Sequence, residues 1–322
     1  MVEGALSIDT GTSGSFADRV YSTYPLRFIP CTEVRRGKKR SVDDGEKADA
    51  KIGTVAMFFM IGFGGGYVSG DCVNVSLDVK EDASCCLRTQ GTTKVFESVR
   101  GAICRQTITS TLDSGSLLVY VPDPTSCFAS SVFEQVQKYM LVAGASCVIV
   151  DMYSSGRKNQ NENWSAKRIR NRIEVYIDDD LKFLENMKLE SHDNLALPSS
   201  NRVKSSIFGT IVIAGPRTKV LDDTLNALSQ RQSFHEYQLK RKHTRTNTSS
   251  NANKKDLISE SALASVSTLS GGINLVRFCA QGAEDAFSFL HDTLAPLNQE
   301  IGFRPYSDRI HFVPPPPDEE SR

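Results

Sequence analysis

Between Ile52 and Glu190 the chain alternates apolar and polar positions or gathers apolar residues into short runs that are rich in β-branched side chains. Gly, Asp, Ser and Pro separate these runs, as turn residues separate strands. Three segments of this region can be laid over one another, and each predicts a strand, a turn of small residues and a second strand. Their sequences are SLDVKEDASCCLRTQG, TSTLDSGSLLVYVPDP and QKYMLVAGASCVIVDM.

The three segments repeat at a nearly constant spacing. Their turn residues Ser84, Ser116 and Ser146 lie 32 and 30 positions apart, and a looser fourth copy, RIEVYIDDDLKFLENMKLE, turns at Asp178 to Asp180. A repeat of this length, interpreted as a hairpin plus a return loop, is typical of stacked β units that cover one another's apolar faces. The pattern is compatible with a sandwich and with an irregular β-solenoid.

The pattern changes after Pro198. A further buried strand is predicted in SIFGTIVIAGP, a helix from Thr218 to Tyr237, a strand in GINLVRFCAQG and an amphipathic helix in AEDAFSFLHDTLAPLNQEIG. The predicted fold class is therefore mainly β, with two or three α-helices near the C-terminus.

Two kinds of segment are predicted to lie outside this framework. Residues 1–18 are rich in Ser, Thr and Gly and are predicted to form a flexible N-terminal arm, which leaves residues 19–322 as a single domain. The polar stretches 35–51 and 240–255 are predicted to be flexible insertions.

The composition narrows the class of partner and the compartment. The chain has 322 residues with 38 basic and 38 acidic side chains, so it lacks the basic excess that binding to nucleic acid or an anionic membrane needs. Its longest apolar stretch, Val55–Phe63, is too short to span a bilayer. The eight cysteines are irregularly spaced within apolar runs, which indicates free thiols and a cytoplasmic location.

A search for catalytic motifs finds no complete one. The glycines from Gly64 to Gly66 lack the Gly-Lys-Ser/Thr of a phosphate loop, and the five histidines are scattered. The adjacent Cys85 and Cys86 point to opposite faces of a strand and cannot share a metal ion. We therefore expect no tightly bound cofactor and favour an interaction protein over an enzyme.

Four motifs occur in the order and spacing of a known family. The chain resembles the urease accessory protein family UreD, also called UreH, from about Tyr24 to Pro315, and RPYSDRIHFVPP resembles the end region of that family. The motifs are GGGYVSGD (Gly64–Asp71), LRTQGTTKVFES (Leu87–Ser98), VPDPTSCFASSVFEQ (Val121–Gln135) and VDMYSSGR (Val150–Arg157) with Trp164.

The resemblance implies a single UreD-like domain whose β-sheets stack in an irregular β-helical, solenoid-like arrangement. It also implies a protein that is not an enzyme and that binds urease apoprotein together with a UreF-like accessory protein and a UreG-like GTPase. That assembly delivers nickel to the urease centre, along with carbon dioxide for its lysine carbamate. UreD is expected to contribute an internal polar route that nickel occupies only transiently.

The resemblance also implies roles for individual residues. Because a chaperone must release its ion, carboxylates suit it better than a Cys/His cage. Asp71, Asp151 and Glu174 are predicted to be the carboxylates of the nickel route. The residues predicted to serve the structure or a partner contact are Gly70, Thr89, Gln90, Gly91, Thr92, Lys94, Glu134, Gln135, Gly156 and Arg157.

The chain departs from the family pattern at two places. The stretch Asn161–Trp164 keeps an acid at Glu162 but lacks the glycine that usually precedes the tryptophan, and Met152 stands where a tryptophan is expected. A second hypothesis, a β-rich enzyme with a carboxylate pair, requires two acids in a closed pocket. A metal route instead requires Asp71, Asp151 and Glu174 to lie along a continuous channel.

Overall fold

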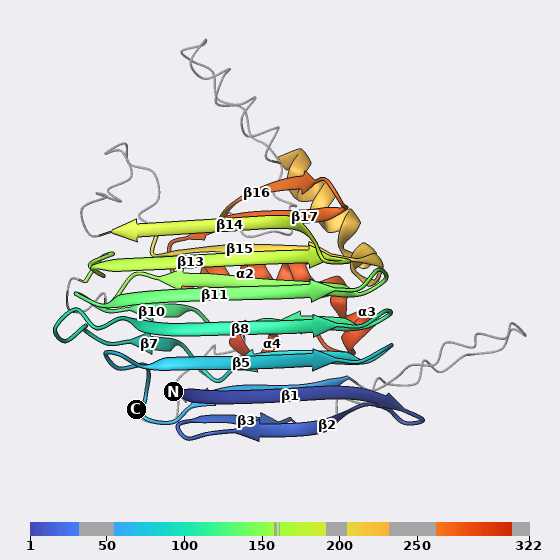
Figure 1. Ribbon diagram of the computed structural model, residues 1–322. Coiled ribbons are helices and arrows are strands. Elements are labelled where there is room, and N and C mark those ends of the chain that lie inside the picture. The colour runs from blue at the N-terminus through green and yellow to red at the C-terminus, as the bar shows by residue number, and fades with distance from the viewer. Residues whose placement is uncertain (32–54, 158–159, 161, 191–204, 232–261, 311–322) are drawn as a thin grey trace, which may run out of the picture.

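Two β-sheets face each other across a shared core in the computed structural model (Figure 1). The structure describes residues 1–31, 55–157, 160, 162–190, 205–231 and 262–310. The predicted insertions at 35–51 and 240–255 lie outside the described residues. We call the seven-stranded sheet sheet A and the ten-stranded sheet sheet B.

Sheet A stacks its strands in the order β14-β13-β11-β8-β5-β1-β2, from the top to the bottom of Figure 1. Along β5, β8 and β11 buried positions alternate with more exposed ones, as expected for a sheet whose outer face is uncovered. The strands are β1 (Val2–Gly11), β2 (Gly14–Ser22), β5 (Cys72–Val79), β8 (Cys104–Leu112), β11 (Val132–Leu141), β13 (Arg168–Ile177) and β14 (Asp180–Glu190).

Sheet B has the order β16-β17-β15-β12-β9-β6-β4-β3, and the short strands β7 and β10 attach to it beside β12. Its central strands are buried on both faces, which explains their continuous apolar sequences. The strands are β3 (Leu26–Pro30), β4 (Ala56–Gly62), β6 (Ser84–Thr89), β7 (Thr93–Val95), β9 (Leu117–Tyr120), β10 (Thr125–Cys127), β12 (Ser146–Ser154), β15 (Ile207–Ala214), β16 (Ala262–Leu269) and β17 (Ile273–Ala280).

The three repeated segments are coils of a β-solenoid. The first strand of each lies in sheet A and the second in sheet B, and both pair in parallel with the same strand of the next segment. The interpretation of these segments as hairpins is therefore wrong, because each segment crosses from sheet A to sheet B at its turn. Each of these corners has one residue in the left-handed region: Asp82, Gly115 or Gly144.

The fourth, looser copy differs from the other three. Strands β13 and β14 pair antiparallel within sheet A, with Ile177 opposite Asp180. This copy is a true hairpin, and it ends the parallel part of the sheet. The return loops, residues 90–103, 121–131 and 155–167, lead from β6, β9 and β12 back to sheet A.

The prediction of a flexible arm at residues 1–18 is wrong. Strand β1 pairs in parallel with β5 and antiparallel with β2. Leu6 and Ile8 are 2% and 1% exposed, because alternate positions of β1 point into the core between the sheets. Of the Ser, Thr and Gly residues that suggested an arm, Gly4 and Ser15 are buried in the fold, and the others lie at outer positions or in the turn of this hairpin.

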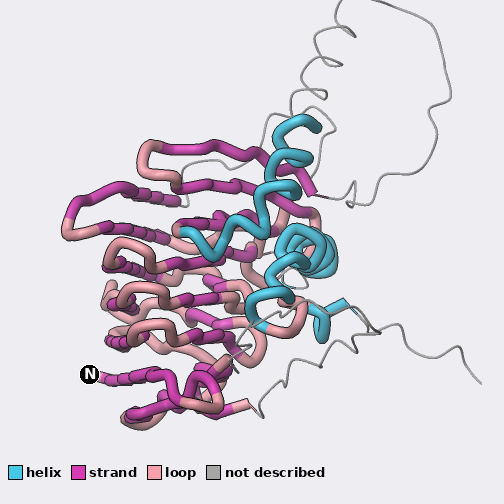
Figure 2. Tube along the Cα trace, turned by 90° about the vertical axis from the view of Figure 1, so that its right-hand side faces the viewer, coloured by secondary structure: helices cyan, strands magenta, loops and turns pink. Residues whose placement is uncertain are grey.

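Sheet B separates two hydrophobic cores. Cys85 points into the core between the sheets, and Cys86 points into the core between sheet B and the helices, as predicted from strand alternation. All eight cysteines are free thiols. The helices gather on one side of the strands (Figure 2), where α2 packs on β17.

The C-terminal helices follow the predicted segments. The helix predicted from Thr218 begins as a 3₁₀ turn at Pro216–Leu221 and continues as an α-helix over 222–231, and residues 232–237 lie outside the described part. Phe289 and Leu290 are buried in the core between sheet B and the helices, as expected for the apolar face of the predicted amphipathic helix. No described helix has the length and hydropathy needed to cross a membrane. The remaining elements are α2 (Ala283–Leu294), a 3₁₀ turn (Ala295–Leu297), α3 (Asn298–Ile301) and α4 (Ser307–Ile310).

Candidate functional site

A row of polar side chains lies inside the molecule, between the two sheets. The Gln106 amide donates a hydrogen bond of 2.8 Å to the Tyr67 hydroxyl, and the Gln135 amide donates one of 3.0 Å to the Gln106 oxygen. The Tyr153 hydroxyl in turn donates to Gln135. Gln106, Gln135 and Tyr153 come from β8, β11 and β12, and Tyr67 comes from the loop between β4 and β5. Together they form a first hydrogen-bonded chain through an otherwise apolar core.

Asp151 is the centre of a second chain beside the first. Its two carboxylate oxygens accept hydrogen bonds of 2.8 Å from the amides of Gln137 and Asn171. The Tyr139 hydroxyl donates to the oxygen of Gln137 at 2.7 Å. The two chains share strands β11 and β12, since Gln135 and Gln137 lie on one face of β11 and Asp151 and Tyr153 on one face of β12.

The charge of Asp151 is not neutralised by its hydrogen-bond partners. The residue is only 7% exposed, and both donors are neutral amides. Burial raises the pKa of Asp151 to about 7; the hydrogen bond from Gln137 opposes this shift, and the nearby Glu185 carboxylate adds to it. Near neutral pH this carboxyl group is therefore close to half protonated.

The polar row continues from Asp151 toward the top strands in Figure 1. Asp151 pairs in register with Thr210 of β15, and Thr210 pairs with Arg277 of β17. The Arg277 Nε donates a hydrogen bond of 3.3 Å to Oε1 of Glu185. Arg277 is about half exposed, so this end of the row lies near solvent.

Two buried oxygens of this row lack a hydrogen-bond partner within the described residues. They are Oδ1 of Asn171 and Oε2 of Glu185. Buried polar atoms normally have a partner, so such atoms indicate room for water or an ion. Together with Asp151 they offer oxygen donors, the ligands that bind a divalent ion loosely. In the described part of the chain, no three His, Cys, Asp or Glu side chains form a metal cluster.

The structure separates the three predicted route carboxylates. Asp71 lies in a surface turn, where its carboxylate accepts the Val68 N–H at 2.8 Å. Glu174 lies on the outer face of sheet A, bonded to Arg172 and Tyr176. Burial acts to raise the pKa of Glu174, but these hydrogen bonds outweigh it and hold that pKa below its usual value. Only Asp151 belongs to the interior row.

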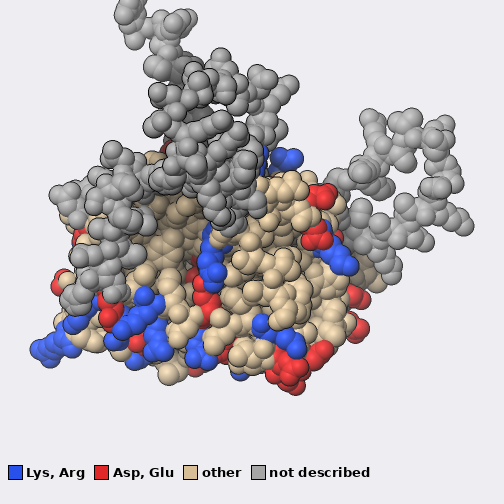
Figure 3. Space-filling model, turned by 90° about the horizontal axis from the view of Figure 1, so that it is seen from above, with Lys and Arg blue, Asp and Glu red and all other residues tan. Residues whose placement is uncertain are grey.

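The predicted pair Glu134 and Gln135 is also divided by strand alternation. Gln135 points inward, whereas Glu134 lies on the outer face between Arg105 and Arg168, at 3.3 and 3.0 Å. On the face seen from above, Lys and Arg side chains likewise stand beside Asp and Glu (Figure 3). Basic and acidic side chains are therefore intermingled on that face.

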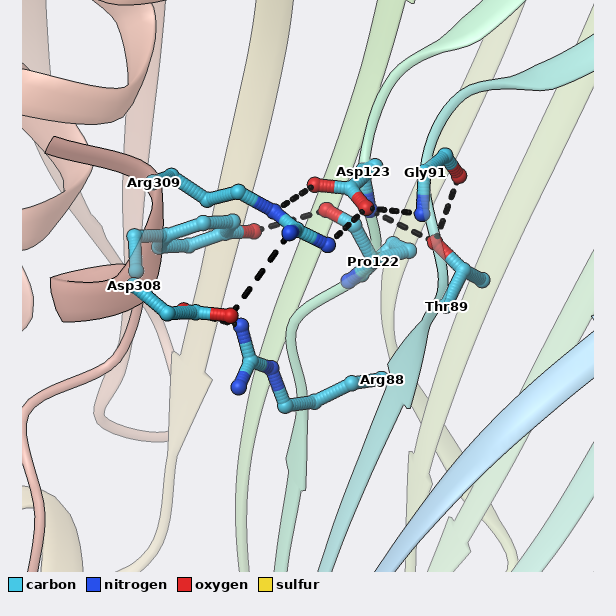
Figure 4. A network of polar contacts seen from close by, with 8 residues as sticks. Arg88, Thr89, Gly91, Pro122, Asp123, Asp308 and Arg309 are labelled. Atoms are coloured by element: carbon cyan, nitrogen blue, oxygen red, sulfur yellow. Dashed lines mark hydrogen bonds and ion pairs between the residues drawn. The ribbon is translucent and has the colours of Figure 1, made fainter. Parts of the chain in front are cut away.

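The motif loop after β6 has exposed side chains at Gln90, Thr92 and Lys94. A backbone hydrogen bond holds the loop in place: the Gly91 N–H donates to the Asp123 carboxylate at 2.6 Å (Figure 4). Just before the loop, the Thr89 hydroxyl accepts the Asp123 N–H at 2.8 Å. Gly70 and Gly91 both have a positive φ, as their turns require.

Arg157 borders an open hollow between the return loops and the loop that precedes β5. Arg157 forms an ion pair with Glu162 and lies over the Phe128 ring at 4.5 Å. A Cβ on the neighbouring Gly156 would lie 2.9 Å from a Glu162 oxygen and 3.3 Å from the Cys127 carbonyl oxygen, so a larger residue there would displace the Glu162 side chain. The hollow has a volume of about 960 Å³, and its lining includes the exposed side chains of Val68, Phe96 and Val99.

Sequence reasoning missed the other members of the interior row. Gln106, Gln137, Asn171 and Glu185 were not among the predicted site residues. A signal was present, because each occupies the inward parity of its strand, as Asn171 does between Ile169 and Ile173. A search of the predicted strands for polar residues at inward-facing positions would have identified these four residues.

Comparisons with known proteins all lead to the same family. The family model described as "UreD urease accessory protein" matches residues 3–311. Urease accessory protein D of Arabidopsis thaliana is 25% identical over 311 residues, covering 95% of this chain and all of that protein. UreD of Sorangium cellulosum is 32% identical over 255 residues, covering 79% of this chain and 73% of that protein. Urease accessory protein 4 of Cryptococcus neoformans is 28% identical over 268 residues, covering 74% and 77%. The motifs, the stacked sheets and these matches agree that the chain belongs to the UreD family of urease accessory proteins.

Proposed function

We propose that the protein is a non-catalytic scaffold of urease maturation that carries nickel through its interior to the urease apoprotein. The family supports the role in urease maturation. In this proposal the scaffold acts in the cytoplasm within a complex that also contains a UreF-like protein and a UreG-like GTPase. Nickel is its cargo and stays bound only transiently.

The observation that carries the proposal is the polar row around Asp151. A divalent ion between two sheets needs oxygen donors and a negative charge, and the row supplies amide oxygens, hydroxyls and the carboxylates of Asp151 and Glu185. The unpartnered oxygens of Asn171 and Glu185 add donors without the need to break a hydrogen bond. Such a set holds the ion weakly enough to release it.

The partner contacts are proposed to use the return loops. The exposed Val68 and Val99, at 54% and 63%, and the half-exposed Phe96 lie together at the hollow. Exposed apolar side chains that gather in one place are typical of protein contact sites. Gln90, Thr92 and Lys94 belong to the first return loop, residues 90–103. They offer polar contacts beside these apolar side chains.

An experiment in cells that lack the gene tests the nickel route. Asp151→Asn keeps the shape of the side chain but removes its charge, and Asp78→Asn removes a half-exposed carboxylate on the outer face of sheet A. We expect abundant urease with at least tenfold less nickel and activity for Asp151→Asn, and normal urease for Asp78→Asn. The readouts are urease activity, an immunoblot and the nickel content of purified urease.

Normal nickel loading by Asp151→Asn at limiting nickel would contradict the route. The alternative of an enzyme with a carboxylate pair would gain support if urease were fully active without this gene. Asp71→Asn and Glu174→Gln complete the series. Because both carboxylates lie outside the row, we expect these variants to retain most of the activation.

A further inference from the structure

The described end of the chain is fastened beside the motif loop. Tyr306 is fully buried, its hydroxyl donates to the Pro122 carbonyl at 2.8 Å, and its ring stacks on Phe287 of α2. Arg309 and Asp308 follow in α4 and point toward sheet B (Figure 4). We call residues 303–310 the C-terminal strap.

The strap neutralises the buried Asp123. This carboxylate is 4% exposed and accepts two hydrogen bonds from the Arg309 guanidinium, at 3.0 and 2.6 Å. The pKa of Arg309 is raised by its hydrogen bond to Asp123. Since a buried charge needs a partner of opposite charge, loss of the Arg309 guanidinium would leave the Asp123 carboxylate buried and without its ion pair.

Asp123 in turn holds the motif loop. The oxygen that accepts from Arg309 Nη2 also accepts the Gly91 N–H at 2.6 Å, and the Asp123 N–H donates to the Thr89 hydroxyl at 2.8 Å. A single carboxylate therefore joins the strap to the backbone of the loop. Gly91 lies between the exposed Gln90 and Thr92, so the position of its N–H determines how both are presented.

A second ion pair joins the strap to the end of β6, just ahead of the loop. The Arg88 side chain is 8% exposed, lies over the Phe59 ring and donates to Asp308 at 2.6 Å. Its Nε is buried without a partner within the described residues. Among the described residues Asp308 is the acidic partner of Arg88, so the strap is tied to the end of β6 as well as to Asp123.

From this geometry we propose that the C-terminal strap sets the shape of the exposed loop 90–94, with Arg309 and Asp123 as positioning residues. The inference rests on the proposed function, in which this loop contacts a protein partner. The strap does not touch the partner; it fixes the backbone from which Gln90, Thr92 and Lys94 extend. Loosening the strap should therefore change the loop while the two sheets stay folded.

Hydrogen–deuterium exchange of the full-length protein tests this link directly. In Arg309→Gln we expect the peptide covering residues 88–96 to exchange at least tenfold faster than in wild type. The peptide covering β12 should keep its protection. Arg304→Gln is the matched control, because it removes an exposed arginine from the same strap and should leave the loop unchanged.

A double variant tests whether Asp123 is the relay. Asp123→Asn should accelerate exchange of the loop as much as Arg309→Gln, and combining the two should give no further acceleration. If Arg309→Gln also exposes β12, Arg309→Lys decides, because lysine keeps the charge but loses the two-pronged hydrogen bond. Lysine should give an intermediate exchange rate in the loop.

Wild-type exchange of the loop in a folded Arg309→Gln or Arg309→Lys protein would overturn the inference, as would equal acceleration in Arg304→Gln. Capture of urease apoprotein is measured on the same proteins and should fall at least fivefold in Arg309→Gln. If wild type itself captures no urease, the proposed function fails, while the exchange result still decides the link between strap and loop.

Discussion

Two buried aspartates lie in contrasting surroundings. Asp123, in the loop that follows β9, faces the strap and is bonded to the Arg309 guanidinium. Asp151, in β12, faces the interior and is bonded only to neutral amides among the described residues. Both are less than a tenth exposed, so the difference between them is one of charge balance and not of burial.

The contrast separates a structural carboxylate from one that can take part in transfer. A carboxylate paired with a guanidinium keeps its charge and its geometry. A buried carboxylate without a cation favours the protonated form, which is why the pKa of Asp151 is raised to about 7. The strap region thus holds a fixed ion pair, whereas the interior row contains a carboxyl group whose protonation changes near neutral pH.

The largest expected effect is the pH dependence of stability that comes from Asp151. The folded state holds the Asp151 proton more tightly than the unfolded state, whose pKa is near 4. The stability from this proton is fully present below about pH 4 and is lost as the pH rises to about 7, by up to about 4 kcal/mol. Asp151→Asn should lack this loss.

Urea unfolding of both proteins with a chelator, from pH 4 to 8, measures the difference. Asn171 can rotate its amide so that its free oxygen accepts from the new asparagine, and so the variant should fold. If the two stability profiles ran parallel over this range, Asp151 would not carry an uncompensated charge, and the contrast with Asp123 would disappear.

The next effect is the loss of the paired aspartate. Asp123→Ala removes three hydrogen bonds and leaves Arg309 without its buried partner. We expect the free energy of unfolding to fall by about 3 kcal/mol at pH 7. Asp78→Ala, at a half-exposed aspartate, is the control and should change it by less than about 0.5 kcal/mol. A loss at Asp123 no larger than the control's would show that the pair does not stabilise the fold.

A smaller effect is expected within the interior row. Tyr139→Phe removes the hydroxyl that donates to Gln137 and leaves a buried acceptor unpaired. The expected loss is about 1 kcal/mol by thermal or urea unfolding. Because Gln137 would then be less constrained, the rate of nickel-dependent urease activation should fall as well. An unchanged stability would indicate that water replaces the hydroxyl and that the row is hydrated.

The smallest effect is expected on the outer face of sheet A. Glu134→Gln breaks two ion pairs with the partly exposed Arg105 and Arg168. Exposed pairs contribute little, so the loss should be about 0.5 kcal/mol and should vanish at high salt. A loss as large as that of Asp123→Ala would mean that burial does not distinguish the two regions.

The alternation of residues predicted the strands well but was applied incompletely to the site. It placed the three repeats, and it predicted the opposite orientations of Cys85 and Cys86. The same alternation places Glu174 outside, with Arg172 and Tyr176, because Ile173 and Val175 fill the core. Following strand parity would have selected Asn171 and Glu185 for the interior instead.

Other features could not be predicted because they depend on contacts that are remote in sequence. Arg309 lies 186 positions from Asp123, and no local pattern links them. The N-terminal strand was mistaken for an arm because its small polar residues resemble a linker until β5 is placed beside it. The choice between hairpins and coils likewise depends on which strands pair in parallel, and local alternation is the same for both.

The parallel coils also make the interior row modular. Each coil adds one strand to sheet A, about 4.8 Å from the strand of the next coil, and alternate side chains of that strand point inward. Gln106 comes from one coil and Gln135 from the following one. Inserting or deleting a whole coil would lengthen or shorten the row by that fixed increment and leave both ends intact. The number of coils is thus a ruler for the distance that an ion would travel between the two ends of the protein.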